Sequence, residues 1–128
     1  MTRGLAVAIW AASVGSAWAL DVPSGQPIHL HEVIADTVGT EIWLRFRFIA
    51  PEIARDGGSV DFAMAEPDFE HLCHTVSLPY IAASDVSPDM AVITLLDRAI
   101  PFGTTDPETT QFVEVFRVSA GACVWEGV

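Results

Sequence analysis

The sequence predicts an α+β domain in which a mainly antiparallel sheet carries one helix on one face, in the order β-β-(β)-α-β-β-β, with one disulfide. Two observations predict the sheet: apolar and polar residues alternate through residues 42–49, and further β-rich runs lie near the C-terminus. A third observation predicts the helix, because apolar residues recur at helical spacing in Phe69, Leu72, Cys73 and Val76.

The first two strands are predicted to form a hairpin. Residues 28–35 are β-rich, although Glu32 interrupts their apolar positions. In residues 42–49 the alternation is regular, with one apolar face made by Ile42, Leu44, Phe46 and Phe48. A short polar segment containing Gly39 joins the two runs, and Pro51 ends the second one.

The middle of the chain predicts an optional third strand at residues 59–65, followed by the helix. We expect the helix to begin near residues 66–72, with Pro67 in its first turn and nearby acids at the positive end of the helix dipole. We interpret these acids as solvent-exposed residues at the start of the helix. Pro79 is expected to kink or end the helix, and residues 80–84 to continue it.

The last third of the chain predicts three strands and a long loop. Residues 90–97 are β-rich and apolar, which indicates a central strand buried on both faces. Residues 98–110 contain several turn formers and predict a loop. Residues 111–119 and 123–128 predict the final two strands.

The N-terminus has the pattern of a secretory signal peptide over residues 1–19. Arg3 precedes an apolar run, and the small residues Ala17 and Ala19 flank Trp18 before the expected cut after Ala19. An uncleaved membrane anchor is the alternative. We therefore expect residues 20–27 to be a linker and 28–128 a single domain, periplasmic or secreted, with no stable membrane insertion after cleavage.

The composition is strongly acidic. Six basic residues, all arginine, face 17 Asp and Glu, and the formal charge is −11, or −12 once Arg3 is removed. Such a surface repels phosphate backbones, so we expect no nucleic-acid partner. Cationic partners, divalent ions or simple solubility remain as explanations.

Cys73 and Cys123 are the only cysteines, and in an exported chain two thiols predict a disulfide. That pairing would tie the helix to the last strand and leave no thiolate for catalysis. The neighbouring segment EHLCHT therefore predicts one end of a disulfide beside two histidines.

The four histidines are the candidate metal ligands. His71 and His74 lie three apart on the predicted helix, and His29 and His31 alternate on the first strand. Either pair could chelate zinc or copper, and together they could complete a four-nitrogen site. The alternative is that both pairs are ordinary surface polar groups, and we expect no cofactor.

Arg45 and Arg47 share one strand face and are candidates for contact with an anion or a partner. The alternative is cross-strand pairing with acids such as Glu114 or Glu126. No nucleophile elbow, phosphate-binding loop or haem attachment motif occurs. With so many carboxylates, no single pair predicts an acid–base site, so an enzyme with an unrecognised carboxylate site remains only an alternative.

Residues 67–73, 92–118 and 123–128 resemble a family of small exported bacterial proteins, of alphaproteobacterial type and of unknown function. The resemblance covers the C-terminal half and implies helix and final-strand cysteines that match Cys73 and Cys123, but no catalytic residue. We expect a small binding or modulating protein with an unknown protein partner in the cell envelope. Its candidate partner loop lies within residues 98–110 and contains Phe102, Thr104, Asp106 and Glu108.

Overall fold

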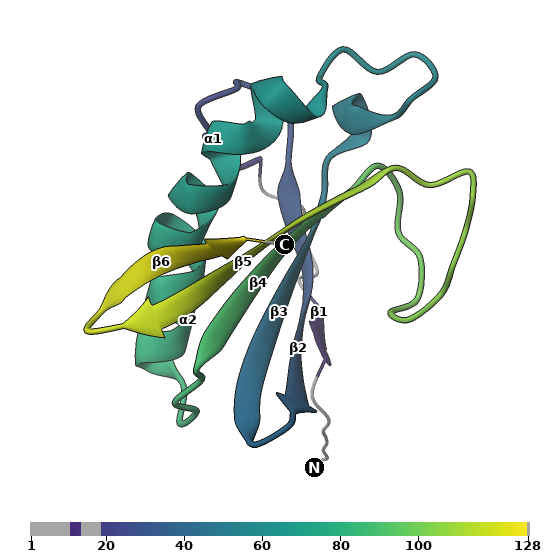
Figure 1. Ribbon diagram of the computed structural model, residues 1–128. Helices are drawn as coiled ribbons and strands as arrows, with labels where there is room; N and C mark the ends of the chain where they lie inside the picture. Colours follow the sequence, from purple (N-terminus) through teal and green to yellow (C-terminus); the bar gives the residue numbers. More distant parts are fainter. Residues whose placement is uncertain (1–10, 14–18, 128) are drawn as a thin grey trace, which may run out of the picture.

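The structure is a computed structural model that describes residues 11–13 and 19–127. Its strands form one six-stranded sheet, and a helical rod covers one face of it (Figure 1). The elements in chain order are β1 (Ala11–Ser13), β2 (His29–Val38), β3 (Glu41–Ile49), the 3₁₀ turn η2 (Pro51–Ile53), α1 (Phe62–Leu72), the π-helical segment η3 (Cys73–Ser77), α2 (Leu78–Ala83), β4 (Met90–Leu96), β5 (Gln111–Ser119) and β6 (Ala122–Gly127). The predicted α+β class is confirmed.

The spatial order of the strands follows the chain, β1-β2-β3-β4-β5-β6. All neighbouring strands are antiparallel except β3 and β4, which are parallel. Parallel neighbours cannot be joined by a tight turn, so the helical rod makes the crossover between them. The sheet is therefore mixed, although most of its pairings are antiparallel as predicted.

The core lies between the sheet and the helical rod. Leu44, Phe46 and Phe48 of β3 meet Phe69 and Leu72 of α1, and all five are at most 1% exposed. Every residue of β4 is buried, which confirms the prediction of a central strand covered on both faces. This packing fixes the position of α1 along the sheet. The side chains on its exposed faces are therefore fixed relative to the sheet as well.

A β-bulge in β2 explains why the first strand alternates poorly. Leu30 pairs with Phe48 and Glu32 pairs with Arg47, so His31 is the extra residue between them. After the bulge the core-facing positions change from even to odd numbers, and Val33 is fully buried opposite Phe46. Glu32 thereby reaches the face away from the helix.

The helix starts earlier than the sequence indicated, and the optional third strand at residues 59–65 is wrong. Asp61 caps α1, because its side chain accepts a hydrogen bond of 2.9 Å from the backbone N–H of Met64. The good helix formers that follow continue the helix directly. Pro67 consequently lies inside α1 and not in its first turn.

Pro79 changes the helix in the turn before it, and not at its own position as expected. It has no N–H, and in a regular helix its ring would meet the carbonyl of Thr75. The turn before it widens into η3, in which the N–H of Leu78 bonds to the carbonyl of Cys73. The rod then continues as α2 to Ala83, close to the expected end at Ser84.

The segment before β2, which we expected to be a linker at residues 20–27, is held against α1. Asp68 is fully buried and accepts hydrogen bonds from the N–H and hydroxyl of Ser24 and from the side-chain amide of Gln26. The interpretation of the acids as a solvated helix start is therefore wrong for Asp68. Three donors replace the water that this carboxylate loses on burial.

Most of the predicted signal peptide, residues 1–19, lies outside the described residues. Of its described residues, 11–13 form β1 and pair with residues 32–34 of β2. Cleavage after Ala19 would remove this strand and leave β2 at the edge of the sheet. No helix in the described ranges has the length and apolar character needed to cross a membrane.

Candidate functional site

The predicted disulfide is confirmed. The Cys73 and Cys123 sulfurs are 2.10 Å apart, and the bond joins the first residue of η3 to β6 across 50 positions. Neither cysteine is free, so thiolate chemistry and thiolate metal ligation are excluded. The bond fixes the edge strand β6 against the helical rod.

His74 supports the same junction. Its Nδ1 lies 3.0 Å from the backbone oxygen of Glu70, and its Nε2 lies 3.5 Å from the backbone nitrogen of Cys123. A neutral ring that donates from Nδ1 and accepts at Nε2 satisfies both contacts. Both ring nitrogens then contact backbone groups of the protein.

The other histidines are spread over separate elements. His71 donates from Nε2 to the backbone oxygen of Asp21, 2.9 Å away, while His29 and the bulged His31 lie on β2. Within the described part of the chain, no group of three or more His, Cys, Asp or Glu is arranged to hold a metal. The four-histidine site stays a prediction that elemental analysis can test.

Arg45 and Arg47 lie on the sheet face away from the helix, where cross-strand acids pair with them. Arg45 binds Asp36 at 3.0 Å, and Arg47 binds Glu32. The pairing is of the predicted kind, but the partners are Asp36 and Glu32, because the bulge brings Glu32 opposite Arg47. Arg47 also donates to the carbonyl of Ile100. Both guanidinium groups thus already pair with acids of the same sheet, and contact with an external anion stays a prediction.

The candidate partner loop is anchored at several points. The ring of Phe102 packs against the guanidinium groups of Arg45 and Arg47, at 5.2 and 5.6 Å. Thr104 donates a backbone hydrogen bond to the carbonyl of Pro101, which closes a turn at the tip. Of the four predicted loop residues, Phe102 therefore contacts the arginines directly, and it remains about half exposed.

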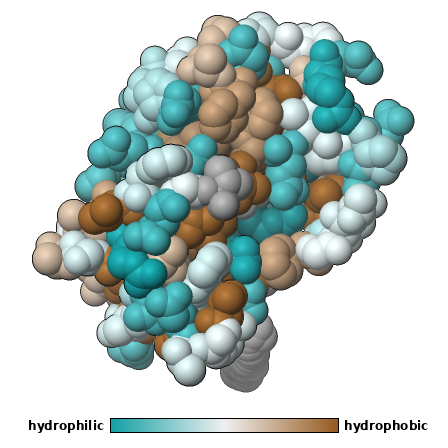
Figure 2. Space-filling model, in the orientation of Figure 1, coloured by the Kyte–Doolittle hydropathy of each residue, from teal (hydrophilic) through white to brown (hydrophobic). Residues whose placement is uncertain are grey.

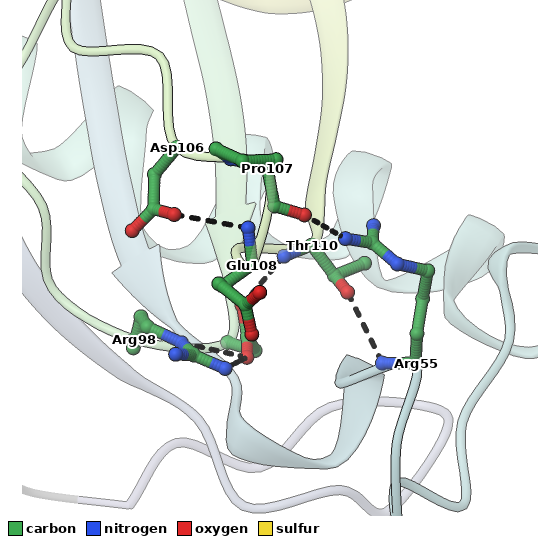
Figure 3. Close-up of polar contacts among 7 residues, drawn as sticks. Arg55, Arg98, Asp106, Pro107, Glu108 and Thr110 are labelled. Atoms are coloured by element: carbon green, nitrogen blue, oxygen red, sulfur yellow. Dashed lines mark hydrogen bonds and ion pairs between the residues drawn. The ribbon is translucent and has the colours of Figure 1, made fainter.

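Arg55 and Arg98 reach the base of this loop from opposite sides, with Glu108 between them (Figure 3). Arg55 donates to the carbonyl of Pro107, and the backbone N–H of Glu108 bonds to Asp106. Arg98 pairs with Asp97 at 3.1 Å. These contacts make the loop part of the folded scaffold and not a free arm.

A hollow between α1 and the β5–β6 hairpin is the candidate site in which aromatic and carboxylate side chains meet. We call it the α1–β6 groove, and it has a volume of about 210 Å³. Its lining consists of Glu66, Phe69 and Glu70 of α1, Glu114 and Phe116 of β5, and Trp125 of β6. Three aromatic rings and three carboxylates thus converge on one small space.

Glu114 is the least expected residue of the groove. It is only 5% exposed, and it accepts a hydrogen bond of 2.5 Å from the indole N–H of Trp125. Burial of a carboxylate is costly unless donors or cations compensate for the lost water. Trp125 is the one donor that the described residues supply, and this residue is 64% exposed at the rim of the groove.

The strand pattern does contain a signal for this site. In β5 the alternation puts Phe112, Glu114 and Phe116 on the same face, and that face looks toward α1. A carboxylate in a core-facing position indicates a buried polar group. Trp125 could not be placed beside it from the sequence, because an irregularity in the β5–β6 register aligns Trp125 with Phe116.

Among the described residues, no cationic side chain neutralises the carboxylates of the groove. Arg117, for example, is bound by Glu41 and Glu126 at the other side of the sheet, and its hydrogen bond to Glu41 raises its pKa. The other described arginines also bind elsewhere, namely Arg45, Arg47, Arg55 and Arg98. The carboxylates of Glu66 and Glu70 lie exposed on α1, one helical turn apart, where they repel each other.

Exposed aromatic residues border the groove. Phe62, whose ring lies 5.9 Å from that of Phe69, and Trp125 are both more than a third exposed. In the space-filling view, tan and brown surface runs from the upper part of the molecule to its middle, with hydrophilic residues on both sides (Figure 2). This combination of apolar surface and acidic rim is the kind that recognises an amphipathic cationic group.

Comparison with known proteins identifies a family but no activity. No curated protein and no solved structure matches the chain. The model of one family matches residues 5–128, so the similarity extends well beyond the C-terminal half that the sequence motifs indicated. The chain belongs to the Family of unknown function (DUF6497).

Proposed function

We propose that this chain is an exported binding domain, periplasmic or secreted, that holds a protein partner of the cell envelope in the α1–β6 groove. The observation that carries the proposal is the buried Glu114 beneath the exposed ring of Trp125. A buried carboxylate with one neutral donor, under an exposed aromatic ring, is costly to maintain in a free protein. A ligand that completes the site would explain why the protein keeps this buried carboxylate.

The covalent structure supports export. A small domain with its only two cysteines joined is typical of oxidising compartments. The apolar run after Arg3 and the small residues before Leu20 add the pattern of a cleaved secretory signal. Both point to a protein that functions outside the cytosol.

Binding fits the geometry better than hydrolysis by the same carboxylates. A volume of about 210 Å³ is below the roughly 300 Å³ at which pockets for whole small molecules begin. Glu114 already accepts a hydrogen bond from Trp125, and Glu66 and Glu70 lie on the open surface of the helix. The groove is suited to receive a side chain, and less suited to enclose a substrate and exclude water around it.

The test is quantitative co-purification from the envelope of the native cells with three tagged forms of the chain. We expect the wild type and the loop variant Glu108→Gln to capture the same partner, and the groove variant Glu70→Gln/Trp125→Ala to lose it. Glu108 is exposed, so its variant matches a loss of one negative charge away from the groove. Equal capture by all three forms would contradict the groove as the binding site.

Localisation is tested separately by fractionation and intact mass. We expect the protein in the periplasmic or secreted fraction, with Leu20 as its first residue and two hydrogens fewer than the reduced mass. A cytosolic protein that retains Met1 and both thiols would contradict export.

A further inference from the structure

We propose that the occupant of the α1–β6 groove is a basic side chain of the partner polypeptide, arginine in preference to lysine. This inference rests on the proposed function and specifies the chemistry of its ligand. It follows from three properties of the groove: uncompensated charge, aromatic surface and size.

The charge of the groove favours a cation from outside. Glu66, Glu70 and Glu114 line the groove, and the described arginines are all bound elsewhere. The carboxylate of Glu114 is buried and has one neutral donor, the indole of Trp125. A guanidinium or ammonium group would supply the missing donors and the opposite charge together.

The aromatic side chains favour a cation on an apolar stem. Phe69 and Phe116, which are 1% and 3% exposed, form the apolar floor, while the ring of Trp125 stays open at the rim. Methylene groups can cover the floor, and a planar cation can stack on the indole. Arginine fits best, because its guanidinium stacks on aromatic faces and presents a fork of donors to carboxylates.

The size favours a side chain over a free ligand. The hollow of about 210 Å³ is smaller than typical pockets for drug-sized molecules. The exposed Phe62, whose ring packs against Phe69 of the groove, extends the contact surface beyond the hollow itself. A polypeptide can use both the hollow and this surface, whereas a free amine can use only the hollow.

The experiment is calorimetric titration of the purified, oxidised protein with acetyl-Gly-Arg-Gly-amide, its citrulline counterpart, its lysine counterpart and free putrescine. One side chain in one small groove is expected to give a Kd of about 1 mM. We expect arginine to bind more tightly than lysine, citrulline not to bind, and added salt to weaken the arginine complex.

Three variants test whether the arginine peptide binds in the groove. Glu114→Gln, which keeps an oxygen acceptor for Trp125, should weaken arginine binding about tenfold. Glu70→Gln removes an exposed charge and should weaken it about two- to fivefold. Glu108→Gln, with the same change of charge outside the groove, should leave it unchanged. Since Glu70 is on the surface of α1, its variant stays informative even if Glu114→Gln does not fold.

The proposal is overturned if citrulline binds as well as arginine, if putrescine binds more tightly than the peptide, or if Glu108→Gln and Glu70→Gln have equal effects. These outcomes are distinct from failure of the proposed function. If the groove variant loses the native partner while no basic peptide binds, the groove is a binding site for a different chemistry.

Discussion

Removal of the disulfide should lower the free energy of unfolding by about 4 kcal/mol. The Cys73–Cys123 bond closes a loop with a sequence separation of 50, and loop-closure entropy for this length is about 4 kcal/mol at 25 °C. A small domain has about 5–15 kcal/mol of stability in total. With roughly 2.1 cal/mol/K of unfolding entropy per residue, the melting temperature should fall by about 15–20 °C.

The assay is urea unfolding of the oxidised wild type, the reduced wild type and Cys73→Ala/Cys123→Ala, followed by circular dichroism. The reduced wild type is the matched control, because it loses the covalent bond and keeps both sulfur atoms in the core. Hydrogen exchange should show the largest loss of protection in β6, an edge strand that pairs only with β5. A loss below about 1 kcal/mol in both reduced and substituted forms would refute the loop-entropy reasoning.

Three further changes test the fold. Asp68→Ala removes the acceptor for Ser24 and the buried amide of Gln26, so the free energy of unfolding in urea should fall by about 3 kcal/mol; a change below about 0.5 kcal/mol would contradict the role of Asp68 in anchoring this segment. Gly58→Ala places a Cβ 2.3 Å from the backbone oxygen of Ala54, and the same measurement should show a loss of about 1–3 kcal/mol; a stabilised variant would show that this turn is not tightly packed. Asp61→Ala removes the cap of α1 and should cost about 1 kcal/mol, whereas Asp61→Ser, which can still cap, should restore most of it.

Local patterns were sufficient to predict much of the fold. The alternation in β3, the uniformly apolar β4 and the helical stripe around Phe69 each depend on residues close in sequence. The disulfide was predictable because the sequence contains only two cysteines, which allow one intramolecular pairing. These features needed no knowledge of how distant segments meet.

The remaining features depend on tertiary structure. The bulge at His31 changes which residues of β2 face the core, and the local pattern shows only that Glu32 interrupts the apolar positions. From the sequence alone, Asp68 is interpreted as a surface acid. In the structure, Ser24 and Gln26 bond to it and cover it. In the same way, Glu114 and Trp125 come together only through the register of β5 and β6, so the groove was absent from the sequence-based candidates.

The most direct test of the account is the two-dimensional ¹H–¹⁵N NMR spectrum of the oxidised protein during titration with acetyl-Gly-Arg-Gly-amide. Trp125 lies in the groove, and Trp43, whose indole donates to Glu41, lies on the opposite face of the sheet. The indole signals are assigned with Trp125→Phe and Trp43→Phe. We predict that the Trp125 indole signal shifts with the added peptide while that of Trp43 stays fixed. A fixed Trp125 signal, or equal shifts of both, would contradict binding in the groove.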